Sequence, residues 1–553
     1  MTVTEPPACA PLPPIDRRAL LSAGLLGAGL TVAPLSAQLP ERGFTSGVAS
    51  GEPGAGSVLL WTRYAAAADT RLHWEVAETL DFGRVVAGGD VTASPEHDGC
   101  AKPKADGLRA GRWYYFRFVA PDGTVSDIGR TRTLPEGKTE RFRMAVFSCS
   151  NLGFGWFNAY AHAAAADDFD CTVHTGDYLY EYAPGLYPSA GQVLPGRVVE
   201  PAREIVALAD YRARFAQYRR DPDLRRLHQL YPMIAGWDDH ESTNDSWSGG
   251  AENHQPGTEG DWSARKAASM RAYREWMPVS DRDWARYEIG DLATLFRLET
   301  RLSARARPFN IGQILAGKAA PGEVEAALAA FRDGDWRDPA RMLIGTDQQA
   351  WLGDGLMASR RAGKVWQVLV QQVLMANLRS PLDAAEWAGS KLADNVRVRL
   401  AGGIAASRAG LPMNMDAWDG YPAARERVFA AAQAAEANLI SLAGDTHNAW
   451  ASDLTAGGKA VGAEFGGQSV TSPGYEASFP QASPERIATA LRETNPELKF
   501  ADTARRGYMA VELTPSAATC EFRFVGNVRD KGSGIVATHR MAMLPGRRRL
   551  ATA

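Results

Sequence analysis

The stretch YPMIAGWDDHE (residues 231–241) decides the fold class, because an apolar strand runs directly into four residues able to bind metal or move protons. Three other stretches have the same design: RFRMAVFSC (residues 141–149), DCTVHTGDYLY (residues 170–180) and NLISLAGDTH (residues 438–447). Ala- and Arg-rich segments of helical character lie between these strands, so residues 139–525 are predicted to form an α/β layered domain. Because ligands in open α/β sheets bind beyond the carboxyl ends of the strands, we expect the four strand ends to meet at one rim.

The chain before this domain has a different pattern. Residues 42–135 alternate short apolar runs with turns and lack a helical period, which predicts a small all-β sandwich of the immunoglobulin or fibronectin kind. Residues 135–138, PEGK, are expected to be a linker. After the α/β domain, residues 526–553 are expected to form a C-terminal tail, with the basic GRRRL (residues 546–550) in solvent.

The N-terminus has the features of an export signal. Arg17 and Arg18 directly precede the weakly apolar ALLSAGLLGAGLTVAPLSA (residues 19–37), a pattern typical of twin-arginine signal peptides. A frayed terminal helix is the alternative. We therefore expect residues 1–37 to be a signal, the twin-arginine machinery to be a partner, and the protein to be periplasmic or secreted. No later apolar run approaches the roughly 20 residues that a membrane span requires.

Composition and cysteine spacing exclude some functions. The 553 residues carry a formal charge of −3, which gives no broad basic field, so no stable nucleic-acid complex is expected. Five cysteines form no zinc-knuckle or paired-disulfide pattern. A bridge between Cys100 and Cys520 and two free thiols both remain open.

The strand ends carry the residue types of a metal cluster. Of nine histidines, His240 and His447 stand in Asp-His or Asp-x-His context, and both fall at strand ends. Taken singly, a cysteine after a strand is usually a core residue, a Gly-Asp pair is usually a turn, and Tyr180 is as easily a packed aromatic. Four such ends in one chain favour metal binding.

A series of motifs makes the chain recognisable. They are FSCS (147–150), GDYLYEY (176–182), WDDHE (237–241), LETR (298–301), GDTH (444–447) and EFGGQSVTSPG (464–474), with FTSGVASGEP (44–53), SVLLWTR (57–63) and SDIGRTRTLP (126–135) before them. The chain thereby resembles the PhoD-like alkaline phosphatases, a branch of the metallophosphoesterases, over residues 42–525. The resemblance implies a sandwich of sheets flanked by helices, and phosphate-ester hydrolysis. Glu299 departs from the more usual Asp of that family's LDTR.

The resemblance also implies ligands for two metal sites. Asp177 would bridge the metals, while Tyr180, Cys149 and His447 would complete the first site. Thiolate with phenolate favours Fe³⁺ there. Asp239 and Asp445 would form an oxygen-rich second site that suits Ca²⁺, with Zn²⁺, Mn²⁺ or Mg²⁺ as alternatives. Asn244 would add a further contact, to the second site or to another Ca²⁺. Asp238 would bind there too, or would lie among the residues that surround the ligands.

Catalytic roles follow from the same comparison. A hydroxide between the metals would attack phosphorus in line, without a covalent phosphoenzyme. His240 would bind the phosphoryl group or protonate the leaving oxygen, with Glu241 orienting its ring. Arg301 is a candidate phosphate clamp, and a surface ion pair is its alternative.

Other classes of function fit the sequence less well. A cysteine phosphatase fails, because Gly155 stands where Cys-x5-Arg needs arginine. Ser469 lacks the second glycine of a nucleophile elbow, so it is expected to be structural or at the substrate rim. An exported binding or adhesion protein with an inactive second domain is the alternative from another class. Within the enzymes, a phospholipase-D-like phosphodiesterase competes with a monoesterase. The expected substrates are small phosphate esters, and the expected state is a monomer.

Overall fold

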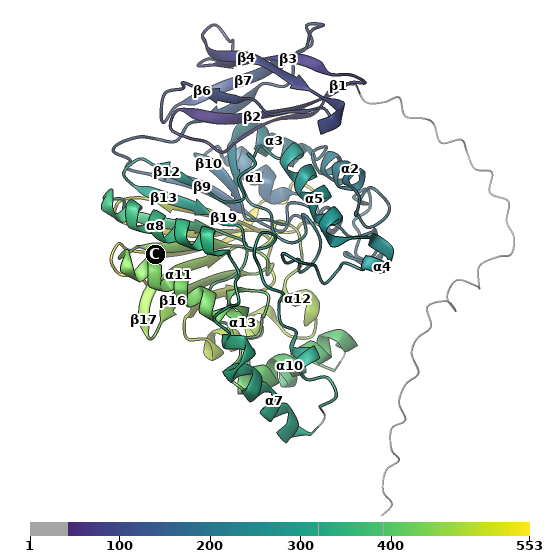
Figure 1. Cartoon of the computed structure of the whole chain (residues 1–553), viewed down its shortest axis with the longest axis vertical. Coiled ribbons are helices and arrows are strands. Elements are labelled where there is room, and N and C mark those ends of the chain that lie inside the picture. The colour runs from purple at the N-terminus through teal and green to yellow at the C-terminus, as the bar shows by residue number, and fades with distance from the viewer. Residues whose placement is uncertain (1–41, 319, 391, 553) are drawn as a thin grey trace, which may run out of the picture. The chain divides into compact units, whose positions relative to one another are not determined.

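The computed structural model describes residues 42–318, 320–390 and 392–552 (Figure 1). The predicted signal at residues 1–37 lies outside them, so the structure does not test it. Among the helices of the described part, none is long and apolar enough to cross a membrane.

Two large sheets form the centre of the protein. The first has the strand order β22-β21-β20-β19-β9-β10-β11-β1-β2-β5, with β6 also paired to β2. Its strands are β1 (Gly43–Gly51), β2 (Ser57–Ala65), β5 (Cys100–Ala101), β6 (Lys104–Asp106), β9 (Phe142–Phe147), β10 (Cys171–His174), β11 (Pro232–Ala235), β19 (Gly507–Leu513), β20 (Ala518–Val525), β21 (Ile535–Met543) and β22 (Leu550–Thr552). The three strands β9, β10 and β11 are parallel neighbours, which is the part of the sheet that positions the site.

The second sheet has the order β12-β13-β14-β15-β17-β16-β18. Its strands are β12 (Ala285–Ile289), β13 (Ala293–Arg297), β14 (Trp366–Val370), β15 (Leu439–Ala443), β16 (Ala449–Ala456), β17 (Lys459–Gly466) and β18 (Leu498–Asp502). Side chains of both sheets share one buried core, in which Met144 and Val173 of the first sheet join Val368 and Leu442 of the second. The sheets therefore pack face to face.

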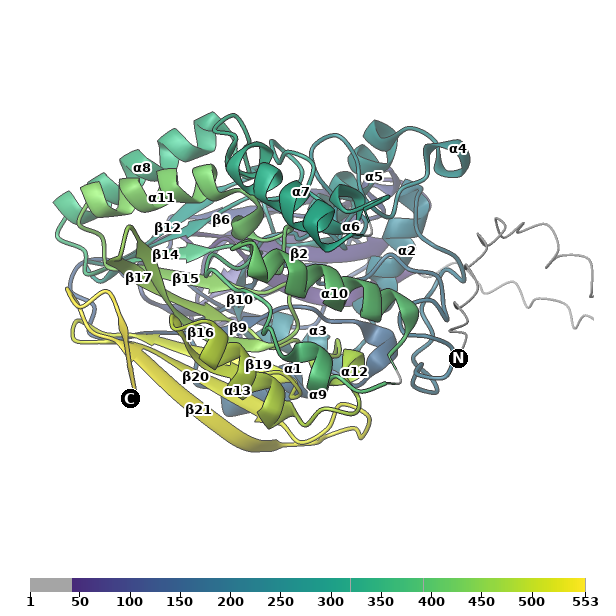
Figure 2. The same cartoon turned by 90° about the horizontal axis from the view of Figure 1, so that it is seen from below.

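Helices cover the outer faces of both sheets. Those packed on the first sheet are α1 (Asn158–Ala166), α2 (Leu208–Tyr218), α3 (Pro222–Leu230) and α5 (Trp262–Trp276). Those packed on the second are α8 (Thr346–Arg361), α11 (Pro422–Ala434) and α13 (Pro484–Thr494), with α8 and α11 side by side in Figure 2. The helix–sheet–sheet–helix arrangement confirms the predicted layered sandwich.

The remaining helices lie in the connecting segments. They are α4 (Pro256–Glu259), α6 (Ile311–Ile314), α7 (Pro321–Asp333), α9 (Ala384–Trp387), α10 (Asp394–Arg408) and α12 (Tyr475–Ser478). Residues of α7 and α10, among them Leu328, Phe331 and Ala406, bury a small core of their own. Helices α6, α7, α9 and α10 lie in residues 310–338 and 381–413, two stretches whose sequence has little strand pattern.

The N-terminal region is all-β, as predicted. A four-stranded sheet has the order β4-β3-β7-β8, and its strands are β3 (Thr70–Ala77), β4 (Val85–Ala93), β7 (Trp113–Val119) and β8 (Gly129–Arg132). It buries Leu72, Phe116 and Phe118 against Leu60 and Ala105 of the strands opposite. Because β1 pairs in parallel with β11, this region is joined to the first large sheet through backbone hydrogen bonds.

The cysteines resolve one open alternative. Cys100, Cys149, Cys171 and Cys520 are all buried and unpaired. Cys100 lies in β5 and Cys520 in β20, so six strands of the first sheet separate them, which is too far for a disulfide. The bridge between Cys100 and Cys520 is therefore wrong, and the two thiols are free.

The expected C-terminal tail over residues 526–553 is wrong. Strand β21 pairs with β20 from Ile535 to Met543, and β22 pairs with β21. Met541 and Met543 are buried in the core between the sheets. Alternate residues of β21 face solvent and so dilute the apolar pattern, which is why the segment resembles a tail in sequence.

A pair of substitutions tests this correction. Met543→Ala is expected to lower the free energy of unfolding by about 2–5 kcal/mol, because it removes a fully buried side chain from a packed core. Val536→Ala in the same strand is the control, since Val536 is 67% exposed and its truncation should cost no more than about 0.5 kcal/mol. Denaturant unfolding measures both. Equal effects would mean that β21 contributes little to the fold.

Candidate metal centre

The four predicted strand ends meet at one place. Parallel register between β9, β10 and β11 brings the segments carrying Cys149, Asp177 and Asp239 out at the same edge of the first sheet. Strand β15 supplies Asp445 and His447, but from the second sheet. The expected rim therefore exists, and it is built by both layers of the sandwich.

The backbone at these ends adopts a conformation that side chains rarely tolerate. Cys149, Asp177, Asp445 and His447 have φ angles of 60°, 56°, 68° and 61°. Left-handed backbone at residues other than glycine costs free energy and concentrates at functional sites. The surrounding fold thus holds these four side chains in directions that a regular strand would not give them.

Two glycines allow the loops to approach each other. A Cβ atom on Gly176 would lie 2.3 Å from Cβ of Asp238, and one on Gly444 would lie 2.6 Å from Cβ of Ser148. Neither distance is compatible with a larger residue. Gly444 therefore permits the contact between the two sheets that brings Asp445 and His447 to the site.

A first group of donor atoms contains sulfur, oxygen and nitrogen. One ligand atom each of Cys149, Asp177 and His447 lies within 4.8 Å of the others. The hydroxyl oxygen of Tyr180 is 3.1 Å from Oδ2 of Asp177 and 3.1 Å from Nε2 of His447. All four residues predicted for the first site are thus together.

Protonation in this group follows from burial. Burial, reinforced by the charge of Asp177, raises the pKa of both Cys149 and Tyr180 well above their ordinary values. Burial lowers the pKa of His447 to about 3, so its ring is neutral. Nδ1 of His447 lies 3.0 Å from the carbonyl oxygen of Pro473, which places the ring proton there and leaves Nε2 free to bind a metal.

A second set of donors is mainly carboxylate. Asp177, Asp239 and His240 form one group within 4.8 Å, and Asp238, Asp239 and Asp445 form another. Asp177 thus belongs both to this set and to the first group, as expected of a bridging ligand. Burial and neighbouring carboxylates raise the pKa of Asp177 and Asp445 well above the ordinary value, and that of Asp238 to about 6.

The donor set fits a bound cation. Oδ1 of Asp177, Oδ2 of Asp238 and Oδ1 of Asp239 are buried and have no hydrogen-bond partner. Such oxygens are costly to bury, and a metal ion would satisfy them. The residues therefore suit metal ions at both predicted sites.

Arg301 is ion-paired with several of these carboxylates. Its fully buried guanidinium is ion-paired with Asp238, with Asp416 at 2.6 Å and with Asp445 at 3.1 Å. The alternative of a surface ion pair is therefore wrong. Asp416 also pairs with Arg305, so a second arginine extends this network.

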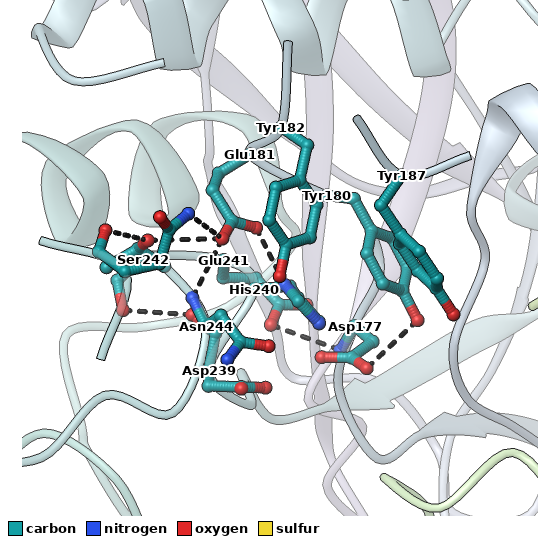
Figure 3. A network of polar contacts seen from close by, with 12 residues as sticks. Asp177, Tyr180, Glu181, Tyr182, Tyr187, Asp239, His240, Glu241, Ser242 and Asn244 are labelled. Atoms are coloured by element: carbon teal, nitrogen blue, oxygen red, sulfur yellow. Dashed lines mark hydrogen bonds and ion pairs between the residues drawn. The ribbon is translucent and has the colours of Figure 1, made fainter. Parts of the chain in front are cut away.

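His240 stands between the carboxylates and a glutamate that the sequence did not single out (Figure 3). Nδ1 of His240 lies 2.7 Å from Oε2 of Glu181, which is completely buried. The His240 ring also packs against that of Tyr180, with the ring centroids 4.1 Å apart and the ring planes tilted by 32°. Although burial alone would lower the pKa of His240, Asp239, Glu181 and Asp177 raise it well above its ordinary value. In the metal-free protein these neighbours favour the protonated imidazole, and the contact with Glu181 fixes the orientation of the ring.

The predicted partner of His240 was therefore the wrong glutamate. Glu241 instead accepts hydrogen bonds from the backbone N–H groups of Asp177, Tyr178 and Asp238, at 3.1, 2.6 and 2.8 Å. Glu241 therefore links the loop after β10 to the loop after β11. It does not contact the ring of His240. Adjacent residues in a turn point in different directions, so sequence proximity misled the assignment.

Asn244 lies at the edge of the site. Its backbone N–H donates to Glu181 at 2.8 Å, and its side-chain amide donates to Glu252 at 2.8 Å. The next residue, Asp245, donates its backbone N–H to Asp239 at 2.7 Å. The loop that contains Asn244 and Asp245 therefore positions Asp239.

Comparisons with known proteins agree with this geometry. The family model described as PhoD-like phosphatase matches residues 144–522, and the model for the N-terminal domain of PhoD-like phosphatases matches residues 30–135. Alkaline phosphatase D of Bacillus subtilis (strain 168) is 32% identical over 519 residues, covering 89% of this chain and 79% of that protein. The solved structure described as "Structure of PhoD" has a TM-score of 0.74 at 29% identity, covering 94% of this chain and 93% of that one.

The match extends over both the sandwich and the N-terminal region, and it includes every strand end that carries a donor. The alternative of an inactive binding or adhesion protein has no comparable support, and the chain is a hydrolase of phosphate esters. By sequence and by fold, it belongs to the PhoD-like phosphatase family.

Proposed function

We propose that this enzyme is a metal-dependent phosphoesterase of the alkaline phosphatase D type. The observation that carries the proposal is the position of Asp177, which belongs both to the group with Cys149 and His447 and to the group with Asp239. Its unpartnered buried oxygen supports a shared ligand between two cations. Cys149, Tyr180, Asp177 and His447 would hold one ion, and Asp177, Asp239, Asp445 and Asp238 would hold the other.

The donor types support different metals at the two sites. Thiolate, phenolate and imidazole donors together favour Fe³⁺ at the first, and carboxylate oxygens favour Ca²⁺ at the second. Zn²⁺, Mn²⁺ and Mg²⁺ are the alternatives. Bound cations would supply Lewis acidity toward the phosphoryl oxygens and would lower the pKa of a nearby water.

The chain's own residues would do the remaining chemistry. His240, protonated and held through Nδ1 by Glu181, has Nε2 free to donate a proton to the leaving oxygen. Arg301 holds Asp238, Asp416 and Asp445 in place against their mutual repulsion. Strained backbone and buried ion pairs fix the side chains before substrate binds, so little reorganisation accompanies reaction.

Small phosphate esters are the proposed substrates, with monoesters and diesters both candidates. We also propose that the protein is exported by the twin-arginine route to the periplasm or beyond, and acts as a monomer. Arg17, Arg18 and the Gly- and Ala-rich stretch after them support export.

Metal analysis of purified protein, with assays of an aryl phosphate monoester and a diester across alkaline pH, tests the proposal. We expect bound iron and a divalent metal, and a visible absorption band from thiolate and phenolate on ferric iron. Cys149→Ser should lose most of the iron, whereas Cys171→Ala, a buried thiol outside the cluster, should keep it. Active protein without metal, or unchanged turnover in Cys149→Ser, would contradict the proposal. The ratio of the two turnover rates decides between monoester and diester.

A further inference from the structure

A short segment after β17 contacts the donors of the first group without adding a ligand of its own. Oγ of Ser472 lies 2.8 Å from the Tyr180 oxygen and 3.2 Å from the carbonyl oxygen of Cys149. The carbonyl oxygen of Pro473 lies 3.0 Å from Nδ1 of His447. Two consecutive residues thus touch Cys149, Tyr180 and His447.

This segment is itself firmly held. Val470 donates its backbone N–H to Ser148 at 2.9 Å, and the hydroxyl of Thr471 donates to the carbonyl of Asn151 at 2.7 Å. Arg506, which is also ion-paired with Glu476, donates to the carbonyl oxygen of Ser472 at 2.9 Å.

The same guanidinium nitrogen of Arg506 donates to the carbonyl of His447 at 3.2 Å, so one side chain fixes the segment and the histidine together. Ser472 itself has no exposed surface. Its hydroxyl therefore occupies a fixed position in the interior of the protein.

Geometry at the Tyr180 oxygen indicates what this hydroxyl does. Three groups surround that oxygen: Asp177 at 3.1 Å, His447 at 3.1 Å and Ser472 at 2.8 Å. Asp177 and His447 are themselves proposed metal ligands, so Ser472 is the neighbour that remains a hydrogen-bond donor when a metal is bound.

We propose that Ser472 is a positioning residue, whose hydroxyl donates a hydrogen bond to the Tyr180 oxygen and so orients that oxygen for the ion that Cys149, Asp177, Tyr180 and His447 would hold. This inference rests on the proposed metal centre. Outer groups that orient a ligand in this way contribute about 10–100-fold to metal affinity or activity. The hydroxyl of Ser469 donates to the carbonyl oxygen of Ser472, so Ser469 also helps to fix this segment. This contact is a structural one, the first of the two roles predicted for Ser469.

Removal of the Ser472 hydroxyl should change the absorption spectrum of the iron site as well as its affinity for iron. A hydrogen bond stabilises the electrons of a phenolate oxygen, so transfer of an electron from that oxygen to ferric iron needs more energy. Ser472→Ala should therefore move the phenolate-to-iron absorption band to longer wavelength. It should also weaken iron retention against a competing chelator by about 10–100-fold.

Thr471→Val is the matched control. Like Ser472→Ala, it removes one buried hydroxyl, from the neighbouring residue. The hydroxyl of Thr471 donates to the backbone carbonyl of Asn151 and does not contact a ligand side chain. We expect its band position and iron retention to equal those of the parent. Circular dichroism and thermal unfolding verify that both variants are folded.

The outcomes separate this inference from the proposed function. If the parent protein binds no iron and has no visible band, the proposed metal centre fails. If the parent has the band, and Ser472→Ala keeps both its wavelength and its iron affinity, the positioning role is overturned while the metal centre stands. Equal band shifts in Ser472→Ala and Thr471→Val would also overturn the positioning role. The shift would then come from poorer packing of the segment and not from loss of the hydrogen bond to Tyr180.

Discussion

Asp177→Asn is expected to lower kcat/KM by at least about 10³-fold and, at the same time, to stabilise the metal-free protein. The carboxylate is shared by two donor groups, and its loss would remove a ligand from both proposed ions. Metal ions supply several kcal/mol of transition-state stabilisation in phosphoryl transfer, and about 4 kcal/mol corresponds to 10³-fold in rate.

The free energy of unfolding of the metal-free protein should rise in Asp177→Asn, because a charge on Asp177 is unfavourable in its buried position. Burial, together with Asp239, Asp238 and Glu241, raises its pKa well above the ordinary value for an aspartate. A carboxyl with a raised pKa contributes stability below its unfolded pKa, and this contribution is lost as pH rises through the folded value. Metal-free protein should therefore become less stable as pH rises from about 4, and Asp177→Asn should flatten that decline.

Thermal unfolding with and without chelator, from acid to alkaline pH, measures the stability effect, and steady-state kinetics measures the catalytic one. Glu464→Gln is the matched control. Glu464 is fully buried and its pKa is raised to about 7, mainly by burial, but it lies outside the donor groups. It should alter the pH dependence of stability without a comparable loss of activity. If Asp177→Asn retained more than a tenth of the parent activity, a bridging role would be untenable.

The local pattern of strand followed by donor residue was sufficient to predict most of this site. Cys149, Asp177, Asp239 and His447 each stand within a few residues of a buried strand end, and the structure brings all of them together. Such a prediction works because parallel strands direct their carboxyl ends to one edge. The Cys, Asp and His residues at these strand ends then indicate a metal site.

Other parts of the site depend on contacts that no local pattern contains. Asp416 pairs with Arg301 across 115 positions of sequence, and it follows a helical insertion without a strand signal. Glu181 was available in the GDYLYEY motif, yet choosing it over Glu241 required the direction of each side chain. Strand β21 was missed for a related reason, since only the partner strand β20 makes its alternating residues informative.

His240→Ala is the second substitution with a large expected effect. Loss of a positioned general acid typically costs about 10²–10⁴-fold in rate, and the loss should depend on the leaving group. An activated aryl phosphate expels a stable anion and needs little protonation, whereas an unactivated alkyl phosphate needs much more. We therefore expect His240→Ala to impair the alkyl ester more than the aryl ester in parallel assays of kcat. An equal loss for both esters would point to a binding role for His240 instead.

Glu181→Gln tests why His240 can act in this way. Bound cations would neutralise Asp177 and Asp239, and Glu181 would then be the main charge that keeps the ring protonated. With Gln at this position the pKa of His240 should fall, so the alkaline limb of the kcat/KM profile should move to lower pH. Glu241→Gln is the discriminating control, because Glu241 accepts backbone hydrogen bonds and does not contact the ring. It should reduce stability and leave the position of that limb unchanged. The reverse result would restore Glu241 as the partner of His240, and with it the assignment based on sequence alone.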